Sequence, residues 1–135
     1  MRLTFFCFVF AALSGLSGMS LGIWMGMHED FTLAPVHAHI NLLGWVTLAL
    51  YGLYHRGVQR ASNRLAWTQV GCAALGMPLM TGGLAAYLAT GADSGGFIVA
   101  GSVLVLLGMA LFLAVLVADL RSGSRPRTAA LASPA

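Results

Sequence analysis

Four apolar runs determine what this chain can fold into. Each is long enough to cross the hydrocarbon core of a bilayer, which takes about 20 residues of α-helix. Only 8% of the 135 residues are charged, whereas soluble domains carry about 25%. We therefore predict an all-α integral membrane four-helix bundle in a single domain, residues 1–121, followed by a disordered tail, residues 122–135. The predicted spans cover residues 3–27, 35–54, 65–90 and 97–120.

The arginines predict how the spans are oriented. All seven basic residues are arginine, and they lie before the first span, between the second and third, and after the fourth: Arg2, Arg56, Arg60, Arg64, Arg121, Arg125 and Arg127. The other two loops carry only Glu29, Asp30 and Asp93. By the positive-inside rule, both termini and the middle loop are predicted to be cytoplasmic. Membrane topology thus accounts for the net charge of +3, and nucleic acid is not an expected partner.

The second apolar run contains the polar side chains that are most informative about function. His37, His39 and Asn41 lie near its start, and no other run has a histidine well inside its span. Ionisable side chains inside a membrane are costly and mark candidate functional sites. At about 100° per residue, one helical stripe would contain His37, Asn41, Gly44, Leu48, Tyr51 and His55. His39 falls about 160° from His37, so the two histidines should contact different neighbours rather than chelate one ion.

The stripe suggests a haem site. A porphyrin lying along a helix needs a ligand at one end and bare backbone further along the same face, and His37 followed by Gly44 fits that need. Met77 or Met80 of the third run could supply a second axial ligand, as a thioether. A second copy of the chain is the other possible source, and we expect a homo-oligomer for this reason. His55, beside Arg56, is expected to be a solvated loop residue.

The segment His37-Ala-His-Ile-Asn-Leu-Leu-Gly-Trp45 resembles the second helix of the haem–copper oxidase catalytic subunit, especially in the cbb3-type and nitric oxide reductase branches. The chain is also similar to short four-span bacterial membrane proteins with this signature. The resemblance covers roughly residues 18–56. It implies a multi-pass protein of the bacterial inner membrane, with His37 ligating haem b and with Gly44 and Trp45 at the small and aromatic positions. His39 is the rival ligand.

The resemblance does not imply oxidase activity by this chain alone. The family's second low-spin ligand, its copper-binding histidines and its high-spin haem ligand come from later helices that have no counterpart here. The expected function is haem binding for electron transfer, or for sensing haem or a diatomic gas. One alternative is a copper site facing outward that delivers metal to an oxidase. Another is a structural or assembly partner of a respiratory complex without a cofactor. The residues of the copper alternative are Met25, Met27, His28, His37 and His39.

Overall fold

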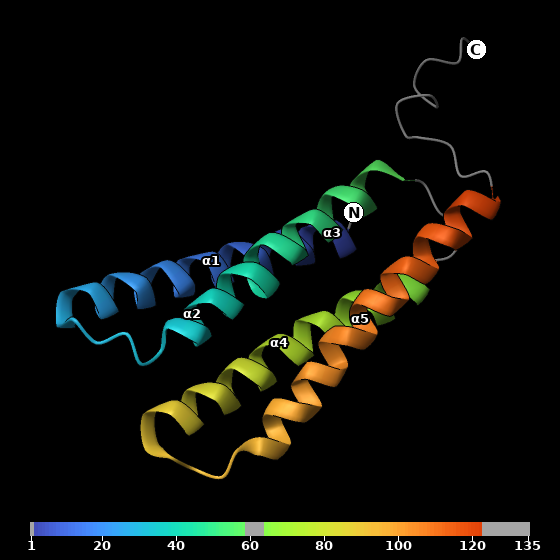
Figure 1. Cartoon of the computed structure of the whole chain (residues 1–135). Helices are drawn as coiled ribbons and strands as arrows, with labels where there is room; N and C mark the ends of the chain where they lie inside the picture. Colours follow the sequence, from blue (N-terminus) through green and yellow to red (C-terminus); the bar gives the residue numbers. More distant parts are fainter. Residues whose placement is uncertain (1, 59–63, 123–135) are drawn as a thin grey trace.

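The computed structural model describes residues 2–58 and 64–122, and within them it confirms the all-α four-helix bundle (Figure 1). The first crossing is α1, and the second consists of three consecutive segments, of which η1 is a π-helix. The elements are α1 (Arg2–His28), α2 (Ala34–His39), η1 (Ile40–Thr47), α3 (Leu48–Gly57), α4 (Arg64–Thr90) and α5 (Gly95–Ser122). All four crossings are long and apolar enough to span a membrane. Apart from Ser122, the predicted tail lies outside the described residues.

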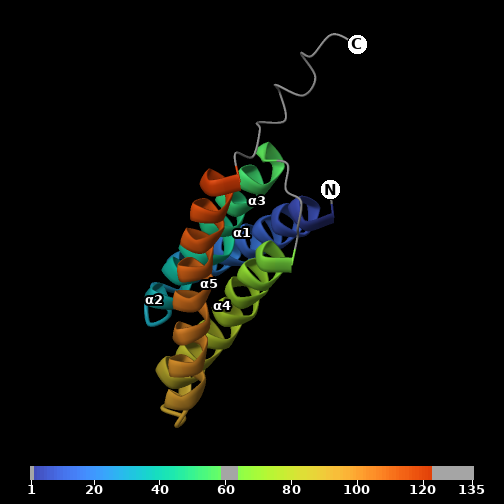
Figure 2. The same cartoon turned by 90° about the vertical axis from the view of Figure 1, so that its right-hand side faces the viewer.

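The bundle is built from two helical hairpins. In Figure 1, α1 lies alongside α2, η1 and α3, while α4 lies alongside α5. The hairpins approach each other most closely where α3 and α5 end, and Figure 2 shows the first turns of α1 and α4 next to each other. The buried core where the hairpins meet consists of Leu3, Cys7, Ala11, Leu48, Tyr51, Ala66, Val70, Ala73 and Ala74.

Glycines bring α4 and α5 into close contact. A Cβ added at Gly76 would lie 2.8 Å from the carbonyl oxygen of Gly101, and one added at Gly108 would lie 3.1 Å from the backbone nitrogen of Ala73. Small residues let two membrane helices pack backbone to backbone. The opposite face of α5 is apolar and open. Only 11% of the membrane-spanning part of α5 is buried inside the protein. The outer side of α5 therefore faces lipid.

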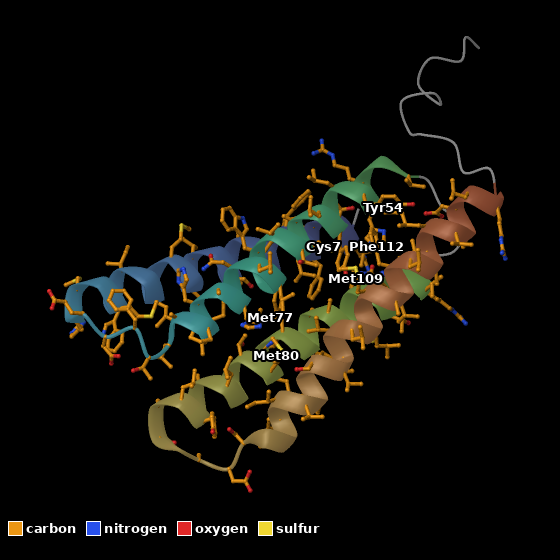
Figure 3. All side chains as sticks on the ribbon, in the orientation of Figure 1. Cys7, Tyr54, Met77, Met80, Met109 and Phe112 are labelled. Carbon is orange, nitrogen blue, oxygen red and sulfur yellow. The ribbon has the colours of Figure 1, made fainter. Side chains whose placement is uncertain are left out.

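Polar side chains connect the hairpins at the end where α3 and α5 terminate. The Tyr54 hydroxyl donates to Asp119 Oδ2 at 2.8 Å, and the Phe112 ring packs edge-on against Tyr54 (Figure 3). His55 Nε2 donates to Gln69 Oε1 at 2.9 Å. The expectation that His55 is a solvated loop residue is wrong, because α3 continues to Gly57 and only 8% of His55 is exposed.

Candidate functional site

The two candidate histidines lie directly before the π-helical segment. Pro35 occupies the first turn of α2, where its missing N–H has no cost. The π-helix then runs from Ile40 to Thr47, and the Thr47 hydroxyl donates to the Leu42 carbonyl, five residues earlier, at 2.8 Å. A π-helix has more residues per turn than an α-helix, and short π segments often occur at functional sites. The predicted stripe nevertheless stays on the protein-facing side past Ile40, since Gly44, Leu48, Tyr51 and His55 are all buried.

His37 is held between two helices. Its ring Nδ1 donates a hydrogen bond to the backbone carbonyl of Gly18 on α1, at 2.8 Å. The ring lies over Gly22, where an added Cβ would be 2.8 Å from His37 Cε1. A carbonyl oxygen can only accept, so Nδ1 carries the hydrogen and Nε2 keeps its lone pair. That tautomer leaves Nε2 able to bind a metal.

Asn41 fixes the other side of the His37 ring. Its Nδ2 donates to the His37 carbonyl oxygen at 2.9 Å and lies 3.5 Å from each ring nitrogen of His37. Its amide occupies the space over Gly18, where a side chain on α1 would overlap it. Without a Cβ at Gly18, α1 leaves room for this amide beside the histidine.

Glycines of α1 accept side chains of the second crossing in succession. Gly22 receives His37, Gly18 receives Asn41, and Gly15 receives Trp45, whose Cγ would lie 3.2 Å from an added Cβ. The face with Gly18 and Gly22 allows close helix packing. It accepts side chains here, and Trp45 remains 45% exposed at its edge.

Gly44 packs against protein. An added Cβ there would lie 2.6 Å from Ser14 Cβ and 2.8 Å from Met77 Cε. Gly44 contacts Ser14 of α1 and Met77 of α4, while His37 contacts Gly18 and Gly22 nearer the C-terminal end of α1. The sequence predicted bare backbone at Gly44, against which a porphyrin could lie. In the structure, the side chains of Ser14 and Met77 occupy that space.

Met77 and Met80 lie on α4, between the hairpins (Figure 3), and only 5% and 7% of their surfaces are exposed. Met77 contacts Gly44, and its sulfur accepts from the Thr81 hydroxyl at 3.7 Å. Met80 packs with its backbone against Gly101 of α5. These contacts connect the two methionines to η1, α4 and α5 rather than to His37.

His39 has a separate backbone partner. Its Nδ1 donates to the carbonyl oxygen of Pro35, four residues earlier in the same helix, at 2.6 Å. The two imidazoles thus contact different groups, His37 a neighbouring helix and His39 its own. By the same argument as for His37, Nε2 of His39 keeps its lone pair, so His39 also has a nitrogen available for a ligand bond.

The residues of the copper alternative point in different directions. Met25 is 4% exposed and Met27 is 76% exposed. His28 donates through Nδ1 to the Trp24 carbonyl at 2.9 Å and stacks on the Trp24 ring. Within residues 2–58 and 64–122, no group of three or more His, Cys, Asp or Glu side chains is placed to hold a metal ion.

The loop between α1 and α2 contains a carboxylate held in a tight turn. Asp30 Oδ1 accepts from the Thr32 hydroxyl at 2.6 Å and from the Thr32 backbone N–H at 3.0 Å. These two hydrogen bonds, first that from the hydroxyl, lower the pKa of Asp30 below its ordinary value. The carboxylate is therefore ionised in this exposed loop.

The chain has no significant match among protein-family models, among curated proteins or among solved structures. The resemblance to the second helix of haem–copper oxidases therefore remains a prediction, based on the nine residues from His37 to Trp45. Any functional conclusion has to rest on the side-chain geometry just described.

Proposed function

We propose that this protein binds a b-type haem through Nε2 of His37. The observation that supports this most strongly is the hydrogen bond from His37 Nδ1 to the Gly18 carbonyl, at 2.8 Å. Histidines that ligate metals usually donate their other ring N–H to a carbonyl or carboxylate, which fixes the tautomer and the ring orientation. His37 is already in that state, and its partner is on a neighbouring helix.

The residues around His37 favour haem over a chelated metal ion. A porphyrin supplies four nitrogen ligands, so the protein needs to contribute only one or two axial ligands. A bare copper or zinc ion needs most of its ligands from side chains, and the described residues bring together no group of three or more His, Cys, Asp or Glu side chains. A bound haem would supply one-electron redox chemistry and an iron site that can bind a gas.

We prefer His37 to His39 as the ligand because of what holds each ring. His37 is fixed between α1 and α2, with the Asn41 amide on one side and Gly22 beneath it. His39 donates to the carbonyl of Pro35 in its own helix. A ligand held by two helices has less freedom to move away from the iron, so the His37 position is better organised in advance for binding.

The biological role we propose is electron transfer, or sensing of haem or a diatomic gas, in a multi-pass protein of the bacterial inner membrane. On the topology indicated by the arginines, His37 lies near the outer face. The second axial ligand separates the two roles, because a six-coordinate haem favours electron transfer and an open position favours gas binding. A second copy of the chain, or a respiratory complex, is the partner we propose as the source of that ligand.

Absorption spectroscopy of the detergent-purified protein tests the proposal. We expect a Soret band, with sharp α and β bands after dithionite reduction, in the wild type and in His39→Ala. His37→Ala should lose at least nine-tenths of the haem per protein. His28→Ala is the matched control, since His28 also donates through Nδ1 to a backbone carbonyl, and it should keep its haem. A colourless wild type, expressed with ample haem, would refute the proposal.

A further inference from the structure

A second surface, at the end of the bundle that carries the arginines, combines charge with exposed aromatic rings. α1 and α4 both begin there, with exposed Arg2 and Arg64 in their first turns. Figure 2 shows these two helix starts next to each other. One turn further along each helix, the rings of Phe6 and Trp67 meet with their centroids 5.8 Å apart.

The two helices are packed firmly beneath this surface. Leu3 and Cys7 of α1 belong to the same buried cluster as Ala66 and Val70 of α4. The aromatic rings, in contrast, reach the outside, with Phe6 36% and Trp67 40% exposed. The pair therefore bridges the seam between the two hairpins on the membrane-facing surface, about one helical turn below the two arginines.

We propose that this surface, formed by Arg2, Phe6, Arg64 and Trp67, binds an anionic phospholipid. Tryptophan is enriched at the boundary between headgroups and acyl chains, and guanidinium groups pair well with phosphate oxygens. The positions of these groups along the helices match a phospholipid. The charges lie at the helix ends, where the headgroup would be, and the rings lie one turn further into the apolar region, where the acyl chains begin. The proposal is independent of whether the protein binds haem.

The charges around the surface favour an anionic lipid over a zwitterionic one. Glu29, Asp30 and Asp93 belong to the loops at the opposite end of the helices, and Asp119, at the same end as the arginines, accepts the Tyr54 hydroxyl hydrogen. Each basic residue near an anionic membrane surface raises affinity by a factor of roughly five. Two arginines should therefore give a clear preference for phosphatidylglycerol over phosphatidylcholine.

Native mass spectrometry of the delipidated full-length protein tests the proposal. Phosphatidylglycerol and phosphatidylcholine with identical acyl chains are titrated separately. We expect wild type to prefer phosphatidylglycerol roughly tenfold or more, as two factors of about five imply. The double variant Arg2→Gln/Arg64→Gln should lose that preference. Arg56→Gln/Arg121→Gln removes the same charge at the same end of the bundle but on α3 and α5, and should retain it.

Trp67→Leu gives a second readout. It keeps an apolar side chain but removes the ring that contacts Phe6, so both lipids should bind more weakly while the preference remains. Equal binding of the two lipids by wild type would overturn the proposal. An equal loss of the preference for phosphatidylglycerol in the two arginine double variants would also overturn it. That result would mean that the lipid responds to the positive charge of the whole end of the bundle and not to a site between α1 and α4. If the double variant does not fold, Arg64→Gln alone is measured instead, and its preference for phosphatidylglycerol should fall about fivefold.

Discussion

His37 on α2 donates its Nδ1 hydrogen to the backbone carbonyl of Gly18 on α1, 19 residues earlier in the chain, at 2.8 Å. Such a bond fixes the histidine in one tautomer and one orientation. It depends on the absence of side chains at Gly18 and Gly22, where Asn41 and the imidazole occupy the space. The packing of the first hairpin and the position of the candidate ligand are therefore determined by the same contacts.

Gly22→Ala tests this dependence. The added Cβ would lie 2.8 Å from His37 Cε1, so the ring has to move and its bond to Gly18 is weakened. We expect haem content, measured as Soret absorbance per protein, to fall by more than half. Gly82→Ala on α4 is the control, because nothing lies within 4 Å of the Cβ it adds. Unchanged haem content in Gly22→Ala would mean that the ring position does not matter for binding.

Asn41→Leu tests the amide beside the ring. Leucine is similar in size but cannot donate to the His37 carbonyl or approach the ring nitrogens with an N–H. Loss of a residue that supports a metal ligand typically lowers affinity by about 10- to 100-fold, and we expect haem affinity, measured by titration of the apoprotein, to fall by roughly tenfold or more. If Asn41 only fills space over Gly18, the affinity will stay within twofold of wild type.

The contact between Tyr54 and Asp119 should stabilise the bundle without affecting the candidate site. Tyr54→Phe removes the hydroxyl that donates to Asp119 at 2.8 Å. A hydrogen bond to a charged group contributes about 1.5–3 kcal/mol, so the free energy of unfolding should fall by about that amount. Tyr87→Phe, at a position that is 54% exposed, should be neutral. Unfolding is followed by circular dichroism in detergent, and the Soret band should be unchanged in both variants.

Gly76→Ala should disrupt the second hairpin. Its Cβ would meet the carbonyl oxygen of Gly101 at 2.8 Å, and backbone cannot move aside as a flexible side chain can. Overpacking of this kind typically costs about 1–3 kcal/mol. Gly71→Ala adds a methyl group on the same helix where nothing lies within 4 Å. A thermal midpoint that falls for Gly71→Ala as much as for Gly76→Ala would contradict the close approach of α4 and α5.

The turn around Asp30 predicts a pH dependence confined to the loop between α1 and α2. Hydrogen bonds from Thr32 lower the pKa of Asp30 below its ordinary value near 3.8. Because the folded-state pKa is lowered, the stabilisation is present above the ordinary value and is lost as pH falls through the lowered one. Thr32→Val removes the hydroxyl but keeps the N–H, so the pKa should rise towards 3.8. Carboxyl NMR shifts measure this, and an unchanged pKa would show that the hydroxyl has no effect.

The sequence predicted the fold well because the membrane imposes strong requirements on it. Twenty or so apolar residues in water-free surroundings must form a helix, so the four crossings follow from the hydropathy alone. These predictions depended on the amino-acid composition and on the length of the apolar runs, and both can be read directly from the sequence.

Two local features could not be read in the same way. The π-helix from Ile40 to Thr47 has no recognised sequence signal. The predicted stripe still faces the protein beyond Ile40, because Gly44, Leu48, Tyr51 and His55 are buried. The burial of His55 depends on Gln69 and Phe112, which come from two other helices. Only the tertiary structure brings such residues together, although the position of Gln69 inside an apolar span was a usable signal.

Chemical rescue shows whether Nε2 of His37 ligates the haem iron. His37→Gly removes the ring and should abolish the low-spin α band of the reduced protein. Added imidazole, at millimolar concentration, should then restore that band by occupying the space that the side chain vacates over Gly22. The predicted result is recovery of the band in His37→Gly, with His39→Gly showing the band already without imidazole. A full α band in His37→Gly before imidazole is added would contradict the account, because the iron would then have another ligand.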